Sequence, residues 1–307
     1  MKLPGISWVL IFFVTAGAAD AADPELMNLL LPSTKVVAGV NVGQAKATPF
    51  GQFLLARMAA ENHLSAKMGF DPRTDLQELL VGTAGQPARE GLILAKGNFN
   101  VQVILAAAQA TGSTVETYNG VPVVTGKART VTDAVAFPGN SIAIFGDLDS
   151  VHAAIDRRTA QSVGIDPALA AEVGQLSGSL DAWSISTVPL AMLASNRKLP
   201  DEQLNTLLNS DLLKSIQETS GGIKFGQTVQ FSGQAVADTS ENATALANVV
   251  RFLGNMLQAN APASTAAAIA ALIQSLSVQT DGNTLILAAA LPESQLESLV
   301  QASHRGR

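Results

Sequence analysis

Tight-turn sequences between alternating apolar stretches are the feature that most restricts how this chain can fold. Asn119-Gly120 separates two strand-like runs in "TVETYNGVPVVT" (114–125), and Asn-Gly is the strongest short-range signal for a β-hairpin. Similar turns are expected at Pro138-Gly139-Asn140 and at Asp281-Gly282-Asn283. Because hairpins join antiparallel strands, and helical patterns lie between them, we predict an α+β fold with antiparallel sheets.

A capping residue followed by proline marks three expected helix starts, at Thr48-Pro49, Asp71-Pro72 and Asp166-Pro167. Apolar residues at helical spacing follow the first and predict a helix over about 50–63. The second is expected to open a short helix over "TDLQELL" (74–80). Further helices are expected at 100–112, 149–158, 200–217, 240–258, 265–274 and 292–302, and further strands at 35–43, 91–97, 134–146, 182–187, 223–237 and 276–290.

The order of expected elements is similar in the two parts of the chain. "GNSIAIFG" (139–146) aligns with "GNTLILAA" (282–289) at a constant offset of 143. We therefore predict two similar halves, each a mostly antiparallel sheet with helices packed on it. The expected divisions are a signal peptide at 1–21, a first α+β half at 22–160, a helical connector at 161–179, a second α+β half at 180–302 and a disordered tail at 303–307.

The N-terminus has the three parts of a secretory signal peptide. Lys2 supplies the positive charge, an apolar stretch runs from about Ile6 to Val14, and Ala19-Asp20-Ala21 fits the A-x-A cleavage rule. Ala16-Gly17-Ala18 fits the same rule, so cleavage after Ala21 or after Ala18 stays open. The apolar stretch is short for a spanning helix. We expect cleavage, a secreted or periplasmic location and no membrane span afterwards.

Composition excludes several classes of function. The chain has no cysteine, which removes disulfides, thiol nucleophiles, thiolate metal sites and the lipid-modified cysteine of bacterial lipoproteins. The formal net charge is −6 without any basic stripe, so nucleic acid is not expected as a partner. Hydrophobic residues make up 47% and charged residues 14%, which indicates a folded body stabilised by core burial.

The stretch "GNSIAIFGDLDSVHAAID" (139–156) resembles a ligand site most closely, because acids crowd the start of a helix after a strand. On a helix beginning at Asp149, the side chains of Asp149, His152 and Asp156 share one face and could hold a divalent cation. The simpler interpretation is that Asp147 or Asp149 caps the helix while His152 and Asp156 lie on its solvated face. The aligned positions of the second half are Ala289, Ala290, Pro292 and Gln295, which favours the cap.

The other motifs carry little weight. "GVPVVTGKA" (120–128) has five residues between its glycines, where a phosphate-binding loop has four, and no Ser or Thr follows Lys127. Ser195 and Lys198 fit the S-x-x-K nucleophile motif, but no K-T-G or S-D-N partner occurs. "GFDPRTD" (69–75) lacks the oxygen-rich alternation of an EF-hand, so Asp71 is interpreted as a helix cap.

Few side chains could act as a catalytic base or a ligand platform. The histidines are His63, His152 and His304, which leaves a Ser-His-Asp triad few candidates. Trp183 and Tyr118 are interpreted as core and hairpin residues.

Several segments together resemble a family of uncharacterised exported bacterial proteins with a repeated α+β body. They are "LMNLLLPSTKVVAGVNVGQAKATPFGQFLL" (26–55), "GFDPRTDLQELL" (69–80), "YNGVPVV" (118–124) and "DAWSISTVP" (181–189). The resemblance implies export and the repeated body. It implies no activity, cofactor or catalytic residue.

The sequence thus predicts an exported non-enzymatic binding or interaction protein that uses the groove between halves or an exposed sheet face. Its partner is an unknown protein or small-molecule ligand, and the oligomeric state is open. No catalytic, cofactor-binding or metal-binding residue is assigned, and no cofactor is expected. The alternatives are an exported carboxylate-dependent hydrolase, with Asp147, Asp149 and Asp156 as first suspects, or a structural cell-envelope component.

Overall fold

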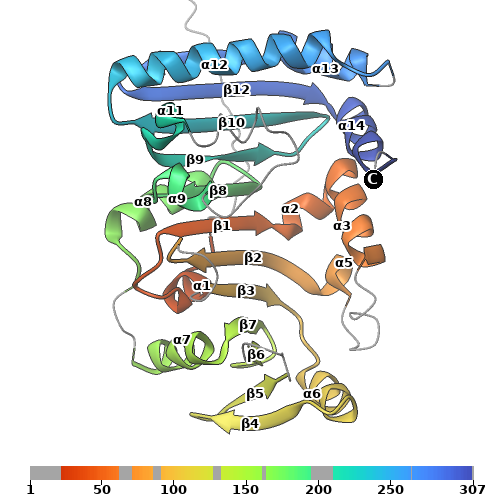
Figure 1. Cartoon of the computed structure of the whole chain (residues 1–307). Coiled ribbons are helices and arrows are strands. Elements are labelled where there is room, and N and C mark those ends of the chain that lie inside the picture. Colours follow the sequence, from red (N-terminus) through yellow and green to blue (C-terminus); the bar gives the residue numbers. More distant parts are fainter. Residues whose placement is uncertain are drawn as a thin grey trace, which may run out of the picture.

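One antiparallel sheet of twelve strands organises the molecule (Figure 1). A computed structural model describes residues 22–61, 71–85, 91–126, 133–160, 164–194, 210–263 and 265–305, with the backbone alone for 57–61, 193–194 and 302–305. The strand order is β11-β12-β10-β9-β8-β1-β2-β3-β7-β6-β5-β4. The strands are β1 (Val36–Asn41), β2 (Leu76–Thr83), β3 (Gly91–Gly97), β4 (Thr114–Tyr118), β5 (Val121–Thr125), β6 (Asp133–Ala136), β7 (Ile142–Asp147), β8 (Ala182–Ser186), β9 (Ile216–Lys224), β10 (Thr228–Ala237), β11 (Ser277–Asp281) and β12 (Thr284–Pro292).

Helices flank both faces of this sheet, which confirms the α+β class. The longest is α12 (Ser240–Ala259), which crosses the end of the sheet at the top of Figure 1. The others are α1 (Pro24–Leu29), α2 (Val42–Lys46), α3 (Pro49–Glu61), α5 (Pro72–Asp75), α6 (Val101–Ala110), α7 (Leu148–Ala160), α8 (Pro167–Ser177), α9 (Leu190–Ala194), α11 (Asp211–Lys214), α13 (Ala266–Ser275) and α14 (Glu293–Arg305).

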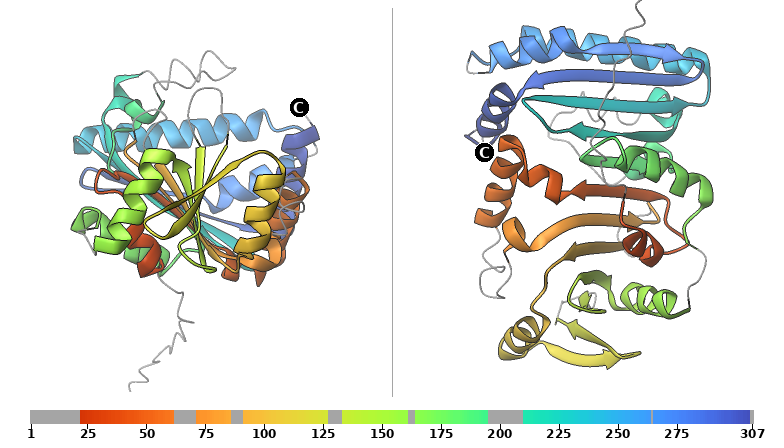
Figure 2. Two further views of the ribbon diagram at one scale, coloured as in Figure 1. Left: turned by 90° about the horizontal axis from the view of Figure 1, so that it is seen from below. Right: turned by 180° about the vertical axis from the view of Figure 1, so that it is seen from behind.

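Helices α1, α7 and α8 cover the back face, away from the viewer in Figure 1, over β8, β1, β2, β3 and β7 (Figure 2). Leu80, Leu94 and Ile144 point to this face from β2, β3 and β7, and none of them exceeds 1% exposure. They pack with Leu26 of α1 and Ile155 of α7. This cluster forms the core behind β1, β2, β3 and β7 and extends to β8 through Trp183 and Ile185.

The front face carries two further clusters. One joins α2, α3, α6 and α14 to residues such as Ala95 and Ala143 on the sheet. The other lies under α12, where Leu246 packs with Ala237 and Leu285. Side chains alternate between faces along a strand, so Ala143 and Ile144 belong to opposite clusters.

The expected hairpins are confirmed. Asn119 and Gly120 have φ of 46° and 78°, the positive values that a two-residue type I′ turn requires. β4 and β5 pair across this turn, β6 and β7 across Pro138-Gly139-Asn140, and β11 and β12 across Gly282-Asn283.

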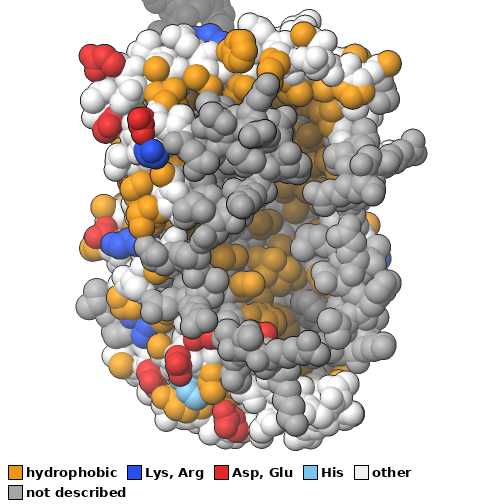
Figure 3. Space-filling view, in the orientation of Figure 1, with side chains coloured by type: hydrophobic (Ala, Val, Ile, Leu, Met, Phe, Trp, Pro, Cys, Tyr) orange, Lys and Arg blue, Asp and Glu red, His pale blue; other side chains and the backbone are white. Residues whose placement is uncertain are grey.

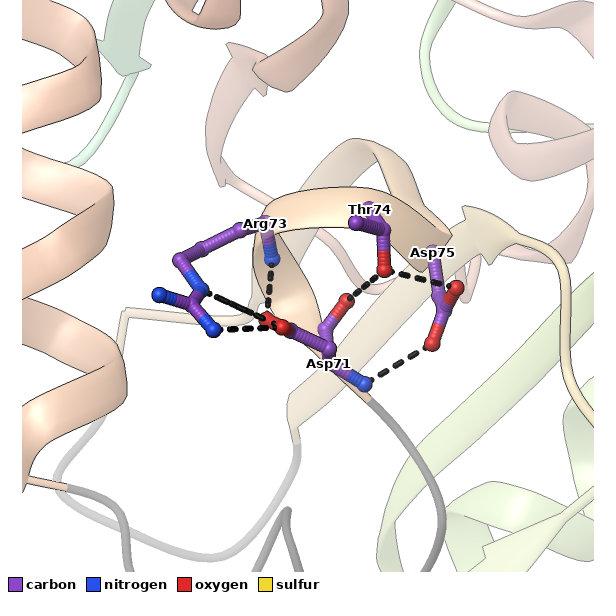
Figure 4. Close-up of polar contacts among 4 residues, drawn as sticks. All are labelled: Asp71, Arg73, Thr74 and Asp75. Atoms are coloured by element: carbon purple, nitrogen blue, oxygen red, sulfur yellow. Dashed lines mark hydrogen bonds and ion pairs between the residues drawn. The ribbon is translucent and has the colours of Figure 1, made fainter.

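The three predicted cap-and-proline helix starts are also confirmed. Asp71 is the clearest, because its carboxylate accepts from the Arg73 backbone N–H at 2.9 Å and pairs with the Arg73 guanidinium at 2.7 Å (Figure 4). Thr74 donates its hydroxyl to Asp75 at 2.9 Å, and the Asp71 N–H donates to the other Asp75 oxygen at 2.8 Å. The hydrogen bond from Arg73 lowers the pKa of Asp71 to about 2. Asp71 is therefore a structural cap, as the sequence indicated.

The expected helix over 74–80 is wrong beyond Asp75, because Leu76 begins β2. Leu79 points to the front cluster and Leu80 to the back one. Apolar residues that point to both faces of a strand, as Leu79 and Leu80 do, form a run with no alternation, which resembles a helical pattern.

The predicted helix over 200–217 is wrong at its end, because α11 ends at Lys214 and Ile216 begins β9. Residues 200–209 lie outside the described residues. The strand pair expected within 223–237 is formed instead by β9 and β10 together. At the C-terminus, α14 takes in Ser303–Arg305, three of the residues assigned to the tail.

The strands of both predicted halves lie in one continuous sheet, since β1 pairs with β8. Outward from this pair, the order is β1-β2-β3-β7 on one side and β8-β9-β10-β12 on the other. Yet the aligned strands do not match in facing: Ile144 points to the back cluster, whereas Leu287 joins the cluster under α12. The division into two similar halves stays a prediction.

Candidate binding surface

The acids at the start of α7 have structural partners. Asp147 accepts from the backbone N–H of Ser150 at 2.9 Å and from its hydroxyl at 2.7 Å. This is the geometry of a helix N-cap. The cap interpretation is confirmed, and it falls to Asp147 rather than Asp149.

His152 and Asp156 hold the β4–β5 hairpin against α7. The His152 ring stacks on Tyr118 with 3.7 Å between ring centroids and 9° between planes. Asp156 accepts from the Tyr118 hydroxyl at 3.0 Å and from the Asn119 side-chain amide at 2.7 Å. The hydrogen bond to Asp156 raises the pKa of Tyr118. As expected, the side chains of His152 and Asp156 lie on the outer side of α7. They contact the hairpin there, however, and do not face only solvent.

Among the described residues, no three His, Asp or Glu side chains gather as ligands of a metal ion would. Lys127, His63 and the Ser195–Lys198 motif lie outside the described residues, and only the backbone of His304 is described. Trp183 is 6% exposed in the back cluster, which confirms its core assignment.

A row of exposed apolar side chains crosses the first half of the front face. Val81, Ile93 and Phe145 are direct cross-strand partners on β2, β3 and β7, and they are 37%, 47% and 36% exposed. Large apolar side chains seldom adjoin one another at the surface unless the patch binds something. The described helices therefore leave this part of the sheet open.

The same row continues through small residues into the second half. From Val81 the successive partners are Ala38, Ser184, Gly221, Gly233 and Leu287. Ser184 and Gly221 line a depression of about 440 Å³ together with Ala182, Thr219 and Ile223. Small side chains thus leave the centre of the sheet lower than its two ends.

Beyond Gly233 the row enters an apolar pocket of about 400 Å³ between the sheet, α13 and α14. Ser232 lines both this pocket and the central depression, so the two adjoin. The larger side chains that line the apolar pocket are Phe231, Leu272, Leu276, Leu287, Leu291, Leu296 and Leu299. We name the exposed row, the depression and this pocket together the front trough.

The front trough is visible in the space-filling view. Figure 3 shows hydrophobic side chains lining a hollow in the middle of the front face. None of the residues that line the depression or the pocket is charged. The row from Leu287 to Phe145 crosses eight strands, which corresponds to roughly 34 Å at the usual strand spacing.

Sequence reasoning did not find this surface. Its members come from eight strands spread between Ala38 and Leu287, and each looks like an ordinary strand residue in its own segment. The one available signal was the run of small residues in "TSGGIKFGQTVQFSGQ" (219–234), where Gly221 and Gly233 face each other.

Two solved structures are similar to this chain over nearly its whole length: crystal forms III and IV of TP0453. Each matches with a TM-score of 0.55, at 10% and 12% sequence identity, covering 92% of this chain and 99% and 97% of the other. At such identity the likeness concerns the fold alone. No family model matches the sequence, and no curated protein matches it.

No helix within the described residues is both long and apolar enough to pass through a bilayer.

Proposed function

We propose that this chain is an exported, non-enzymatic binding protein that holds an apolar ligand in the front trough. The observation that carries the proposal is the exposed, uncharged row of Val81, Ile93 and Phe145, which leads into a leucine-lined pocket. Burial releases about 25 cal/mol for each Å² of apolar surface removed from water. A ligand lying along the trough would gain this free energy over its whole length.

The chemistry of the trough supports binding rather than catalysis. Its polar groups are hydroxyls such as those of Ser184 and Thr219, and no acid, base or histidine lines the depression or the pocket. The alternative of a carboxylate-dependent hydrolase loses support because Asp147 caps α7 and Asp156 binds the hairpin. The alternative of a structural envelope component predicts no affinity for a small apolar molecule.

Binding of N-phenyl-1-naphthylamine, a dye that fluoresces in apolar surroundings, tests the proposal. Gly233→Val is the sharpest variant. A Cβ at Gly233 would lie 3.9 Å from both Leu287 and the Ser220 carbonyl, an ordinary contact, so the added side chain fills the trough without disturbing the strand. We expect saturable binding by the wild-type chain and at least about tenfold weaker binding by Gly233→Val, equivalent to about 1.4 kcal/mol.

Matched substitutions separate the trough from general hydrophobicity. Ile93→Thr removes apolar surface inside the row, whereas Val103→Thr does so on α6, where the side chain is 45% exposed but lies outside the trough. We expect weaker dye binding for Ile93→Thr and no change for Val103→Thr. Equal dye binding by all four chains, or none by the wild type, contradicts the proposal.

A further inference from the structure

The longest helix, α12, is apolar around most of its circumference. After its first turn, the polar residues form one narrow strip at alternating spacings of four and three: Thr244, Asn248, Arg251, Asn255 and Gln258. The side that packs on the sheet is buried at Leu246, Ala247 and Gly254. A helix that is apolar nearly all round is normally buried on most of its sides. The sheet covers only part of the apolar surface of α12.

A second apolar stripe on α12 is exposed. Its residues also recur at alternating spacings of four and three, and they are Ala245, Val249, Phe252, Met256 and Ala259. Phe252 is 65% exposed, more than any other large apolar side chain that the structure describes. Figure 3 shows hydrophobic side chains along the upper edge of the molecule, where α12 lies. This spacing is the one with which two helices pack in a coiled coil. We name these five residues the α12 seam.

The surroundings of the α12 seam carry very little charge. None of residues 252–280 is charged, in a chain of which 14% is charged. This stretch includes the last eight residues of α12 and the whole of α13. The charged residues of α12 are Glu241, in its first turn, and Arg251. The Arg251 guanidinium donates to the Asn248 side chain at 3.1 Å and to the Val278 carbonyl at 2.8 Å. The seam is therefore an apolar surface with neutral surroundings.

We propose that the α12 seam is the interface of a homodimer, in which α12 packs antiparallel against α12 of a second copy. A two-fold interface brings one patch against itself, so a charge on it would face its like. The seam meets this condition, because the polar residues beside it are the uncharged Asn248 and Asn255. Its ends, Ala245 and Ala259, lie seven residues to either side of Phe252. Antiparallel pairing therefore sets Phe252 against its counterpart near the axis and alanine against alanine at both ends.

A lipid surface fits the α12 seam less well than a second copy. Helices that lie on membranes typically have Lys and Arg along the polar face, where these residues attract anionic lipids. Arg251 is the single cation of α12, and its hydrogen bonds hold it to its own chain. The formal net charge of −6 also acts against an anionic surface. Packing against an identical helix needs no cation.

The size of the α12 seam indicates a reversible dimer. With 20 residues, α12 is about 30 Å long, and a helix is about 10 Å wide. The footprint of one helix is then roughly 300 Å², well below the about 800 Å² per partner of a stable interface. We therefore expect dimers only at high protein concentration. None of the seam residues lines the depression or the pocket of the front trough, so the dimer is independent of the proposed ligand.

Sedimentation equilibrium of the purified exported protein tests the dimer. The average mass of the wild type should rise from monomer toward dimer between about 1 µM and about 500 µM, a range that covers a micromolar Kd. Phe252→Lys and Phe252→Glu each place like charges against one another at the axis, so each should raise the Kd at least about tenfold. Val103→Lys makes the same change at a 45% exposed residue of α6 and should leave the Kd unchanged. Because Phe252 is exposed, its variants should fold.

A mixture of the two Phe252 variants tests the antiparallel arrangement, because Lys of one copy then faces Glu of the other. The mixture should contain more dimer than either variant alone, and equal amounts would overturn the arrangement. A wild-type chain that is monomeric up to about 500 µM, or a dimer that persists in Phe252→Lys, overturns the proposal. Flotation with phosphatidylcholine vesicles examines the alternative occupant. A monomeric wild type that floats with the vesicles, and a Phe252→Lys variant that does not, would assign the seam to a lipid surface instead.

Discussion

Two strand–helix units, β7 with α7 and β12 with α14, arise from similar sequences yet have different environments. Each strand is the third beyond the central pair of β1 and β8. Ile144 of β7 is 0% exposed under α7 on the back face, whereas Leu287, aligned with it, lines the open pocket beside α14 on the front. The similar sequences thus give the same types of element, a strand followed by a helix. The position of the helix decides whether the strand contributes to the core, as β7 does, or to the front trough, as β12 does.

The largest expected difference comes from truncating these two aligned residues. Ile144→Ala should lower the free energy of unfolding by about 3–4 kcal/mol, because the cavity is enclosed on all sides. Leu287→Ala should cost about 1 kcal/mol, because its site is already open, but it should weaken dye binding roughly fivefold. Urea denaturation and dye titration of both variants measure these effects. Similar losses of stability in the two variants would contradict the distinction between β7, which is buried under its helix, and β12, which lines an open pocket.

The same contrast explains how far the sequence could predict the structure. Hairpins at Asn119-Gly120 and Gly282-Asn283, and caps at Asp71 and Asp166, depend on neighbouring residues only, and they were predicted. The β2 strand was not, because its apolar residues point to both faces of the sheet and pack with partners distant in sequence.

The front trough was missed for a related reason. Periodicity indicates which residues of a strand share a face, but not whether a helix will cover that face. Ile144 and Leu287 occupy equivalent places in nearly the same motif, yet Ile144 is buried under α7, whereas Leu287 lies between the cluster under α12 and the pocket beside α14. The acids after β7 are of types that suggest chemistry, yet Asp147 caps the helix and Asp156 binds the hairpin.

The polar side of the β7–α7 unit gives a spectroscopic prediction. Tyr118 is the single tyrosine of the chain, so absorbance of tyrosinate during an alkaline titration reports its pKa alone. Asp156→Asn should lower that pKa toward its ordinary value, because it weakens the hydrogen bond and removes the negative charge that stabilise the protonated phenol. Asp149→Asn removes an equal charge from the same helix without touching Tyr118, and it should change the pKa little. A larger change in Asp149→Asn would show that the Asp156 contact does not hold the hairpin.

Stability should follow the same titration. The pKa of Tyr118 is raised in the folded chain, so the contribution of this contact is present below about pH 10 and is lost as the pH rises through the raised value. Asp156→Asn should therefore reduce the difference in stability between neutral and alkaline pH.

The smallest expected effect concerns the start of α14, where Ala290 stands in place of Asp147, the residue that caps α7. Burial, and secondarily the charge of Glu297 one turn later, raises the pKa of Glu293. Like charges at this spacing destabilise a helix by a few tenths of a kcal/mol, and a Glu–Lys pair stabilises it by about as much. Glu297→Lys should therefore raise the melting temperature slightly at pH 7, by more than Glu297→Gln, which only removes the repulsion. The gain should shrink in high salt, since exposed pairs are screened. Equal melting temperatures of the two variants would mean that charge in the first turn of α14 contributes nothing to stability. The helix would then be held by its apolar contacts with α3 and the front trough.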